Sequence, residues 1–84
     1  MRLIKKMTDD LVFEAEAFEN ARNWGHKAYA YYKGKLVAES KVIYYNRTWE
    51  AYPFQSVLRS LVYKLDETKE VPLADRIHAY RCLQ

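Results

Sequence analysis

The chain has 84 residues, half of them hydrophobic and 30% charged, with a net charge of +3. This length fits one domain and leaves little interior for an enclosed active site, and the composition is that of a globular chain. We therefore expect a single domain over residues 1–84 that binds a partner and is not an enzyme. No stretch has signal-peptide character or approaches the ~20 apolar residues of a membrane span, so we expect no membrane contact.

The positive charge is concentrated in the middle of the chain. Residues 1–24 carry four basic and five acidic side chains, residues 25–48 carry five basic and one acidic, and residues 49–84 carry five of each. The middle third alone therefore has an excess of four positive charges, five minus one. The single cysteine, Cys82, cannot form an internal disulfide, which favours a reducing compartment. We expect a cytoplasmic protein.

Residues 9–23 have the pattern of an amphipathic helix. Thr8 is a good N-cap, and apolar residues recur at helical spacing from Leu11 to Phe18. Gly25 fits the end of this helix, because glycine reaches the left-handed conformation at no steric cost. The face opposite the apolar residues would be acidic and would carry Glu14, Glu16 and Glu19.

Residues 27–32 and 36–45 change to the pattern of β-strands, rich in Tyr, Val, Ile and Ala. Lys33, Gly34 and Lys35 between them are the strongest hairpin signal in the chain. We predict two antiparallel strands. In the second strand, one face would carry Leu36, Ala38, Val42 and Tyr44, and the other Val37, Glu39, Lys41, Ile43 and Tyr45.

The longest apolar stripe lies in residues 54–65 and predicts the helix that forms the spine of the core. Pro53 suits its first turn, because proline lacks only an N–H that this turn leaves unpaired. The stripe consists of Phe54, Val57, Leu58, Leu61, Val62 and Leu65. Pro72 would open a last short helix, whose core-facing side would carry Leu73, Ile77 and Tyr80.

Together these segments predict a small single-domain α+β fold. An antiparallel β-hairpin or sheet would pack against two main helices plus a short C-terminal helix. For residues 1–7, a short strand and an extra helical turn both remain open.

The sequence shows no catalytic, cofactor-binding or metal-binding signature. His26 and His78 lie in different predicted elements, and neither has a Cys or carboxylate at the spacing of a metal site or a catalytic triad. Gly25 and Gly34 stand alone, so there is no glycine-rich phosphate loop. Cys82 is expected to be a small apolar residue at the edge of the core. We expect neither enzymatic activity nor a cofactor.

The predicted hairpin carries the one group of residues with binding character. Tyrosines that can stack on bases alternate with lysines that can neutralise phosphates, as in single-strand binders. The same residues suit a protein partner, because Tyr and Arg are frequent interface anchors. Strand propensity and protection of an exposed edge explain them without any ligand. The candidate partner- or nucleic-acid-binding residues are Lys27, Tyr29, Tyr31, Lys33, Lys35, Lys41, Tyr45 and Arg47.

The run Tyr-Asn-Arg-Thr-Trp-Glu, from Tyr45 to Glu50, with Tyr52 and residues 54–58 after it, resembles a motif in short uncharacterised bacteriophage-encoded proteins of Gram-positive hosts. The resemblance implies a phage or mobile-element origin. Phage proteins of this size often bind and block a host factor or a defence nuclease, and anti-CRISPR proteins are one such class. The motif carries no assigned activity and transfers no functional residue to this chain.

We therefore expect a small non-enzymatic binding protein, encoded by a phage or mobile element, that inhibits or regulates a host protein in the host cytoplasm. The alternative is a nucleic-acid-binding module that uses the basic, Tyr-rich hairpin. A purely structural or oligomerising module is a third class. The sequence leaves open whether the protein is a monomer or a homodimer.

Overall fold

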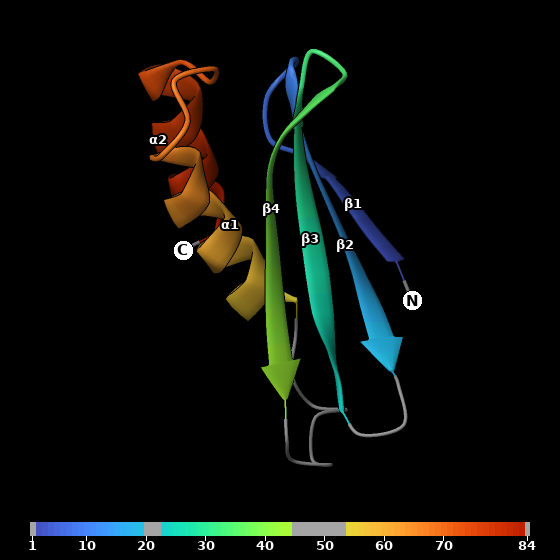
Figure 1. Ribbon diagram of the computed structural model, residues 1–84. Helices are drawn as coiled ribbons and strands as arrows, with labels where there is room; N and C mark the ends of the chain where they lie inside the picture. Colours follow the sequence, from blue (N-terminus) through green and yellow to red (C-terminus); the bar gives the residue numbers. More distant parts are fainter. Residues whose placement is uncertain (1, 20–22, 45–53, 84) are drawn as a thin grey trace.

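The computed structural model describes residues 2–19, 23–44 and 54–83. Four strands are followed by two helices, namely β1 (Arg2–Lys6), β2 (Leu11–Glu19), β3 (Trp24–Tyr32), β4 (Lys35–Tyr44), α1 (Gln55–Leu65) and α2 (Leu73–Cys82). The strands form one antiparallel sheet in the order β1-β2-β3-β4, so each strand pairs with its neighbour in the chain. Both helices lie on the same side of this sheet (Figure 1). Of the helices in the described residues, neither is long and apolar enough to cross a membrane.

The chain is α+β as predicted, but the predicted arrangement is wrong. Residues 11–19 form β2 instead of the first main helix. For residues 1–7 a strand and a helical turn were both open, and residues 2–6 form the strand β1. The described residues thus contain a four-stranded sheet and two helices, and not a hairpin with three helices.

β2 is a strand because its burial alternates with a period of two. Successive side chains of a strand point to opposite faces of the sheet, so every second residue reaches the core. The fully buried residues of β2 are Leu11, Phe13 and Ala15, and the half-buried ones between them are Val12, Glu14 and Glu16. The apolar residues from Leu11 to Phe18 also fit a helical spacing, and pairing on both sides with β1 and β3 decides between the two.

Thr8 and Gly25 were expected to begin and end the predicted helix, and both have a role in the sheet instead. Thr8 accepts a hydrogen bond at Oγ1 from the backbone N–H of Leu11 (3.0 Å) in the turn between β1 and β2. Gly25 lies in β3, directly opposite Phe18 of β2. A Cβ atom at Gly25 would lie 2.0 Å from the carbonyl oxygen of Val42 and 2.9 Å from the Phe18 ring. The close approach of these groups therefore requires glycine at this position.

The predicted hairpin is confirmed, with β3 and β4 as its strands. Its turn consists of Lys33 (φ 52°) and Gly34 (φ 83°), and two positive φ angles in a two-residue loop are typical of a type I′ turn. This turn matches the right-handed twist of the flanking strands. The hairpin is therefore fixed by local sequence.

A β-bulge near the turn changes the predicted faces of β4. Ala30 pairs with Ala38, but the next residue, Tyr31, pairs with Leu36, so Val37 has no partner in β3. As a result Val37 packs against the core and Leu36 is 47% exposed. The predicted grouping of Leu36 with Ala38 on one face is wrong for this reason.

Helix α1 covers the sheet with the stripe that the sequence predicts. Its buried residues are Val57, Leu58, Leu61, Val62 and Leu65, and Phe54 at its start packs partly against the core. They meet small and apolar side chains of the sheet, among them Leu11, Phe13, Ala15, Ala28 and Ala30. Each fully buried aliphatic side chain contributes roughly 1.5–3 kcal/mol to folding. The predicted helix start at Pro53 lies outside the described residues.

Helix α2 differs from its prediction in the direction of its apolar side chains. Leu73, Ile77 and Tyr80 were expected to pack on the core, but they are 60%, 44% and 45% exposed. The helix is held on the core by Ala79 and by Leu83 just after its end, which are both buried. The side of α2 with the larger apolar residues therefore faces outward.

Candidate interaction surfaces

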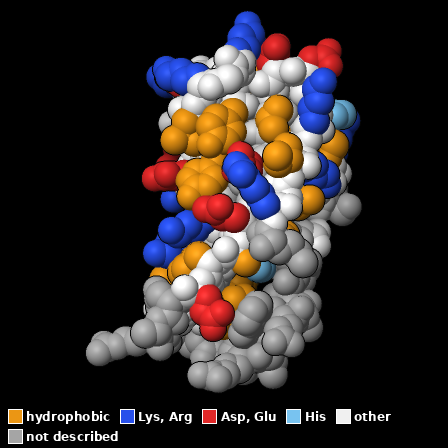
Figure 2. All heavy atoms as spheres, turned by 90° about the vertical axis from the view of Figure 1, so that its right-hand side faces the viewer, with side chains coloured by type: hydrophobic (Ala, Val, Ile, Leu, Met, Phe, Trp, Pro, Cys, Tyr) orange, Lys and Arg blue, Asp and Glu red, His pale blue; other side chains and the backbone are white. Residues whose placement is uncertain are grey.

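The sheet has a face that no described element covers, and we call it the open sheet face. Strand pairing sets its side chains in rows, because directly paired residues point to the same side. In one row Lys27 lies beside Lys41 and Glu16, and in the next Tyr29 lies beside Glu39 and Glu14. Figure 2 views the molecule from this side and shows hydrophobic side chains interleaved with basic and acidic ones.

The open sheet face also carries aliphatic side chains. Ile4 of β1 is paired with Glu14 and is 64% exposed, and Leu36 of β4 is paired with Tyr31. Phe18 lies over Gly25, and the Nζ atoms of Lys27 and Lys41 lie 5.0 and 4.9 Å from the centre of its ring. Cation–π contacts at these distances hold both lysines over an aromatic surface. The face is thus a mosaic of aromatic, aliphatic and charged groups.

Four of the eight candidate binding residues share the open sheet face. They are Lys27, Tyr29, Tyr31 and Lys41, and the first three are half-buried. Lys33 lies in the turn, with its Nζ 5.7 Å from the centre of the Tyr32 ring. Lys35 points the other way, because its Nζ forms an ion pair of 2.9 Å with Glu70 in the segment between the helices. Tyr45 and Arg47 lie outside the described residues.

The open sheet face also carries two acidic residues that the sequence prediction placed on a helix. Glu14 and Glu16, expected on the outer side of a helix, lie on β2 beside the tyrosines and lysines of β3. Glu14 forms an ion pair with Arg2, and the Tyr29 hydroxyl donates to Oε1 of Glu16 at 3.5 Å. The alternation of apolar and acidic residues in 11–19 was the signal that could have placed them.

The tyrosine at the centre of this face has a perturbed titration. Burial, followed by the charges of Glu16 and Glu39, raises the pKa of Tyr29 above its usual value. The Tyr29 hydroxyl therefore remains a hydrogen-bond donor throughout the neutral pH range. Its one hydrogen is directed at Glu16, so the hydroxyl offers a partner its oxygen as an acceptor.

The charges of the open sheet face nearly cancel. Arg2, Lys6, Lys27 and Lys41 are opposed by Glu14, Glu16 and Glu39. The excess of one positive charge, four minus three, is smaller than the hairpin sequence suggested. The adjacent carboxylates weaken the attraction of this face for a phosphate backbone.

A buried aromatic cluster lies on the opposite side of the sheet, next to the helices. His26 is 4% exposed, and its ring centre lies 5.3 Å from that of Tyr44 and 4.4 Å from that of Phe54. Trp24 stacks on Tyr44 with their ring centres 4.6 Å apart. Burial lowers the pKa of His26, so the ring is neutral in the folded protein near pH 7. Its surroundings are those of a core histidine.

The described residues provide no recognisable metal site. In residues 2–19, 23–44 and 54–83, no group of three or more His, Cys, Asp or Glu side chains could hold an ion. Cys82, expected at the edge of the core, is instead exposed on the last turn of α2.

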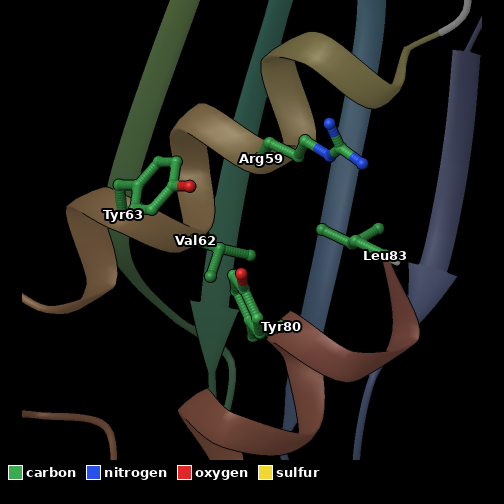
Figure 3. A pocket seen from close by; sticks show the side chains of 5 residues that line it. All are labelled: Arg59, Val62, Tyr63, Tyr80 and Leu83. Atoms are coloured by element: carbon green, nitrogen blue, oxygen red, sulfur yellow. The ribbon is translucent and has the colours of Figure 1, made fainter.

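A groove between the two helices is a second surface, which the sequence did not predict. One part of it is a hollow of about 170 Å³, lined by Arg59, Val62, Tyr63, Tyr80 and Leu83. Figure 3 shows that Arg59 and Tyr63 come from α1 and that Tyr80 and Leu83 face them from α2 and its end. The groove continues along both helices past Leu73, Ile77 and Arg81. The two helices that line it lie on one side of the sheet (Figure 1), and the open sheet face is the other side.

Comparison of the chain with protein-family models, with curated proteins and with solved structures finds no match.

Proposed function

We propose that this protein is a small non-enzymatic binding module and that the open sheet face contacts a protein partner. The observation that supports this is the arrangement of Tyr29 and Tyr31 among aliphatic side chains, with lysines and glutamates around them. Tyrosines provide large contact areas at low entropic cost, and a rim of mixed charge selects the partner's orientation.

A protein partner fits this face better than nucleic acid does. The row that contains Lys27 and Lys41 also contains Glu16. A phosphate chain that crosses the face would meet Glu14, Glu16 and Glu39 in turn, and such contacts are repulsive. A protein surface can present acidic and basic groups in the complementary order, which a uniformly charged polymer cannot.

The resemblance of residues 45–58 to phage proteins supports a more specific proposal. The partner would be a protein of a Gram-positive host, and binding would inhibit or regulate it in the host cytoplasm. An anti-defence role, including that of an anti-CRISPR protein, belongs to this proposal.

Affinity purification from host lysate, with and without nuclease treatment, tests the proposed function. The decisive variant carries both Ile4→Thr and Leu36→Thr. These substitutions remove exposed apolar area from the open sheet face, and threonine is a residue that strands favour. A control is Lys69→Ala, at an exposed position in the segment between the two helices. We expect a nuclease-resistant partner that the double variant loses and the control retains. Equal recovery by the double variant would contradict the role of this face.

Nucleic-acid binding remains the second candidate, because Lys27 and Lys41 lie directly opposite each other. Titration of a single-stranded oligonucleotide at several salt concentrations separates the two. If these lysines bind phosphates, the affinity should fall with salt with a log–log slope of about −0.7 per contact. No binding in low-salt buffer would eliminate this candidate.

A further inference from the structure

The outward direction of the apolar side of α2 is the most unusual feature of the helical layer. Leu73, Ile77 and Tyr80 recur at the spacing of one helix face, yet this face points to solvent. Tyr63 of α1, which is 62% exposed, extends the same surface. Contiguous exposed apolar side chains of this kind mark interaction sites in soluble proteins.

The shape of this surface is that of a groove for an elongated ligand. The hollow beside Leu83 and the shallower stretch toward Leu73 share Val62, Tyr63 and Tyr80, so they form one continuous depression between α1 and α2. Both walls are helices, whose backbone groups bond within the helix, so the groove offers no strand edge for pairing. An amphipathic helix that inserts its own apolar face is the ligand that such a groove fits.

The charges along the groove define the chemistry of that ligand. Arg59, Arg76 and Arg81 line it, and Asp66 is the one acidic residue of its described lining. Asp66 is already paired with Arg76 at 3.1 Å, which leaves Arg59 and Arg81 to meet charges of a ligand. Arginine binds carboxylates in a bidentate geometry and is enriched at interface anchors.

We propose that the groove between α1 and α2 binds an acidic amphipathic helix of a protein partner. Leucine-like side chains of the partner would fill the hollow between Tyr63 and Tyr80, and its flanking carboxylates would bind Arg59 and Arg81. A second copy of this chain is a poorer occupant, because a symmetric contact would bring the arginines of both copies together. The groove is built from α1 and α2, which lie on one side of the sheet (Figure 1), and the open sheet face is the other side, so both can be occupied at once.

The test uses two synthetic helical peptides of about five turns, roughly 18 residues. Both carry leucine at every third or fourth position, and the flanking positions are Glu in one peptide and Lys in the other. Binding to the full chain is measured by fluorescence anisotropy, and the contact is located by NMR shifts of α1 and α2. We expect the Glu peptide to bind at least about tenfold more tightly, a difference of about 1.4 kcal/mol.

Variants of the chain separate the contribution of charge to peptide binding from the contribution of apolar contact. Arg59→Glu with Arg81→Glu should reverse the preference between the two peptides, because it reverses the free charge of the groove. Ile77→Ser should weaken both peptides to a similar degree. The control Ile4→Thr with Leu36→Thr should change neither, because both residues lie on the other side of the sheet.

Four outcomes of the peptide test would overturn the proposal. They are the absence of binding, equal affinity for both peptides, an unchanged preference in the double arginine variant, and shifts located outside α1 and α2. Self-association of the chain through the groove, seen as a concentration-dependent mass in sedimentation, would also overturn it in favour of a second copy. Circular dichroism of each variant establishes that the fold is retained.

Discussion

The hydroxyl of Ser40 in β4 donates a hydrogen bond of 2.6 Å to the hydroxyl of Ser60 in α1. Ser40 is 5% exposed, so this is a polar contact inside the junction between the edge strand and the helical layer. A buried hydroxyl that loses its partner carries a desolvation penalty, whereas two apolar groups in its place are nearly neutral. The bond therefore fixes how α1 lies on β4 more than it adds to stability.

Removal of one partner of this bond should destabilise the protein more than removal of both. Ser60→Ala should lower the free energy of unfolding by about 1–2 kcal/mol, because Ser40 keeps its hydroxyl without an acceptor. Adding Ser40→Ala should recover part of that loss. Urea denaturation of both single variants and the double variant measures the coupling, and strictly additive effects would show that the two hydroxyls do not depend on each other.

Gly25 should be the least replaceable glycine. In Gly25→Ala, the new methyl would overlap the backbone oxygen of Val42 and press on the Phe18 ring, and we expect a loss of about 3 kcal/mol or more. Gly34 is the matched control, because a Cβ there meets no atom within 4 Å. Gly34→Asn should change stability by about 0.5 kcal/mol at most, since Asn tolerates positive φ in type I′ turns. Similar melting temperatures for the two variants would refute the close packing at Gly25.

Two leucines in the helical layer should differ sharply in their contribution to stability. Leu61 in α1 is fully buried, and Leu61→Ala should lower the free energy of unfolding by about 2–5 kcal/mol. Leu73 in α2 is 60% exposed, and Leu73→Ala should change it by about 0.5 kcal/mol at most. Chemical denaturation of both variants provides the comparison. A large loss for Leu73→Ala would mean that the apolar side of α2 belongs to the core.

Stability should decrease in mild acid because of His26. Burial among aromatic rings lowers its pKa in the folded state below the usual 6.5 of an unfolded chain. The contribution of the neutral ring is therefore fully present above pH 6.5 and is lost as the pH falls through the lower folded-state pKa. Urea unfolding midpoints measured from about pH 8 to about pH 5, the range over which imidazole titrates, test this effect.

A pair of histidine variants assigns this pH dependence to one residue. His26→Gln should make the urea midpoint nearly independent of pH over this range, although it also lowers stability at every pH. His78→Gln, at an exposed position on α2, should keep the slope of the parent protein. A slope that survives in His26→Gln would assign the titration to another group.

Elements with local signals could be predicted from the order of the residues. The turn is specified by Gly34, which adopts a positive φ at no steric cost, and the buried side of α1 by its apolar period. The strand period in turn puts Lys27, Tyr29 and Tyr31 of β3 on one face, because alternate residues of a strand point to the same side. These parts of the fold and of the candidate surface could be predicted. Lys41 joins them only through the bulge at Val37, which shifts the pairing of β4 with β3 by one residue.

Where local signals allow two solutions, contacts between distant parts of the chain determine which one forms. Residues 11–19 fit a helical and a strand period alike, and the backbone partners offered by β1 and β3 made the segment a strand, which moved Glu14 and Glu16 onto the open sheet face. In α2 the apolar side chains at Leu73 and Ile77 were expected inside. Close packing of the small Ala79 and of Leu83 against the core holds the helix by its other side, so the larger residues point to solvent and line the groove.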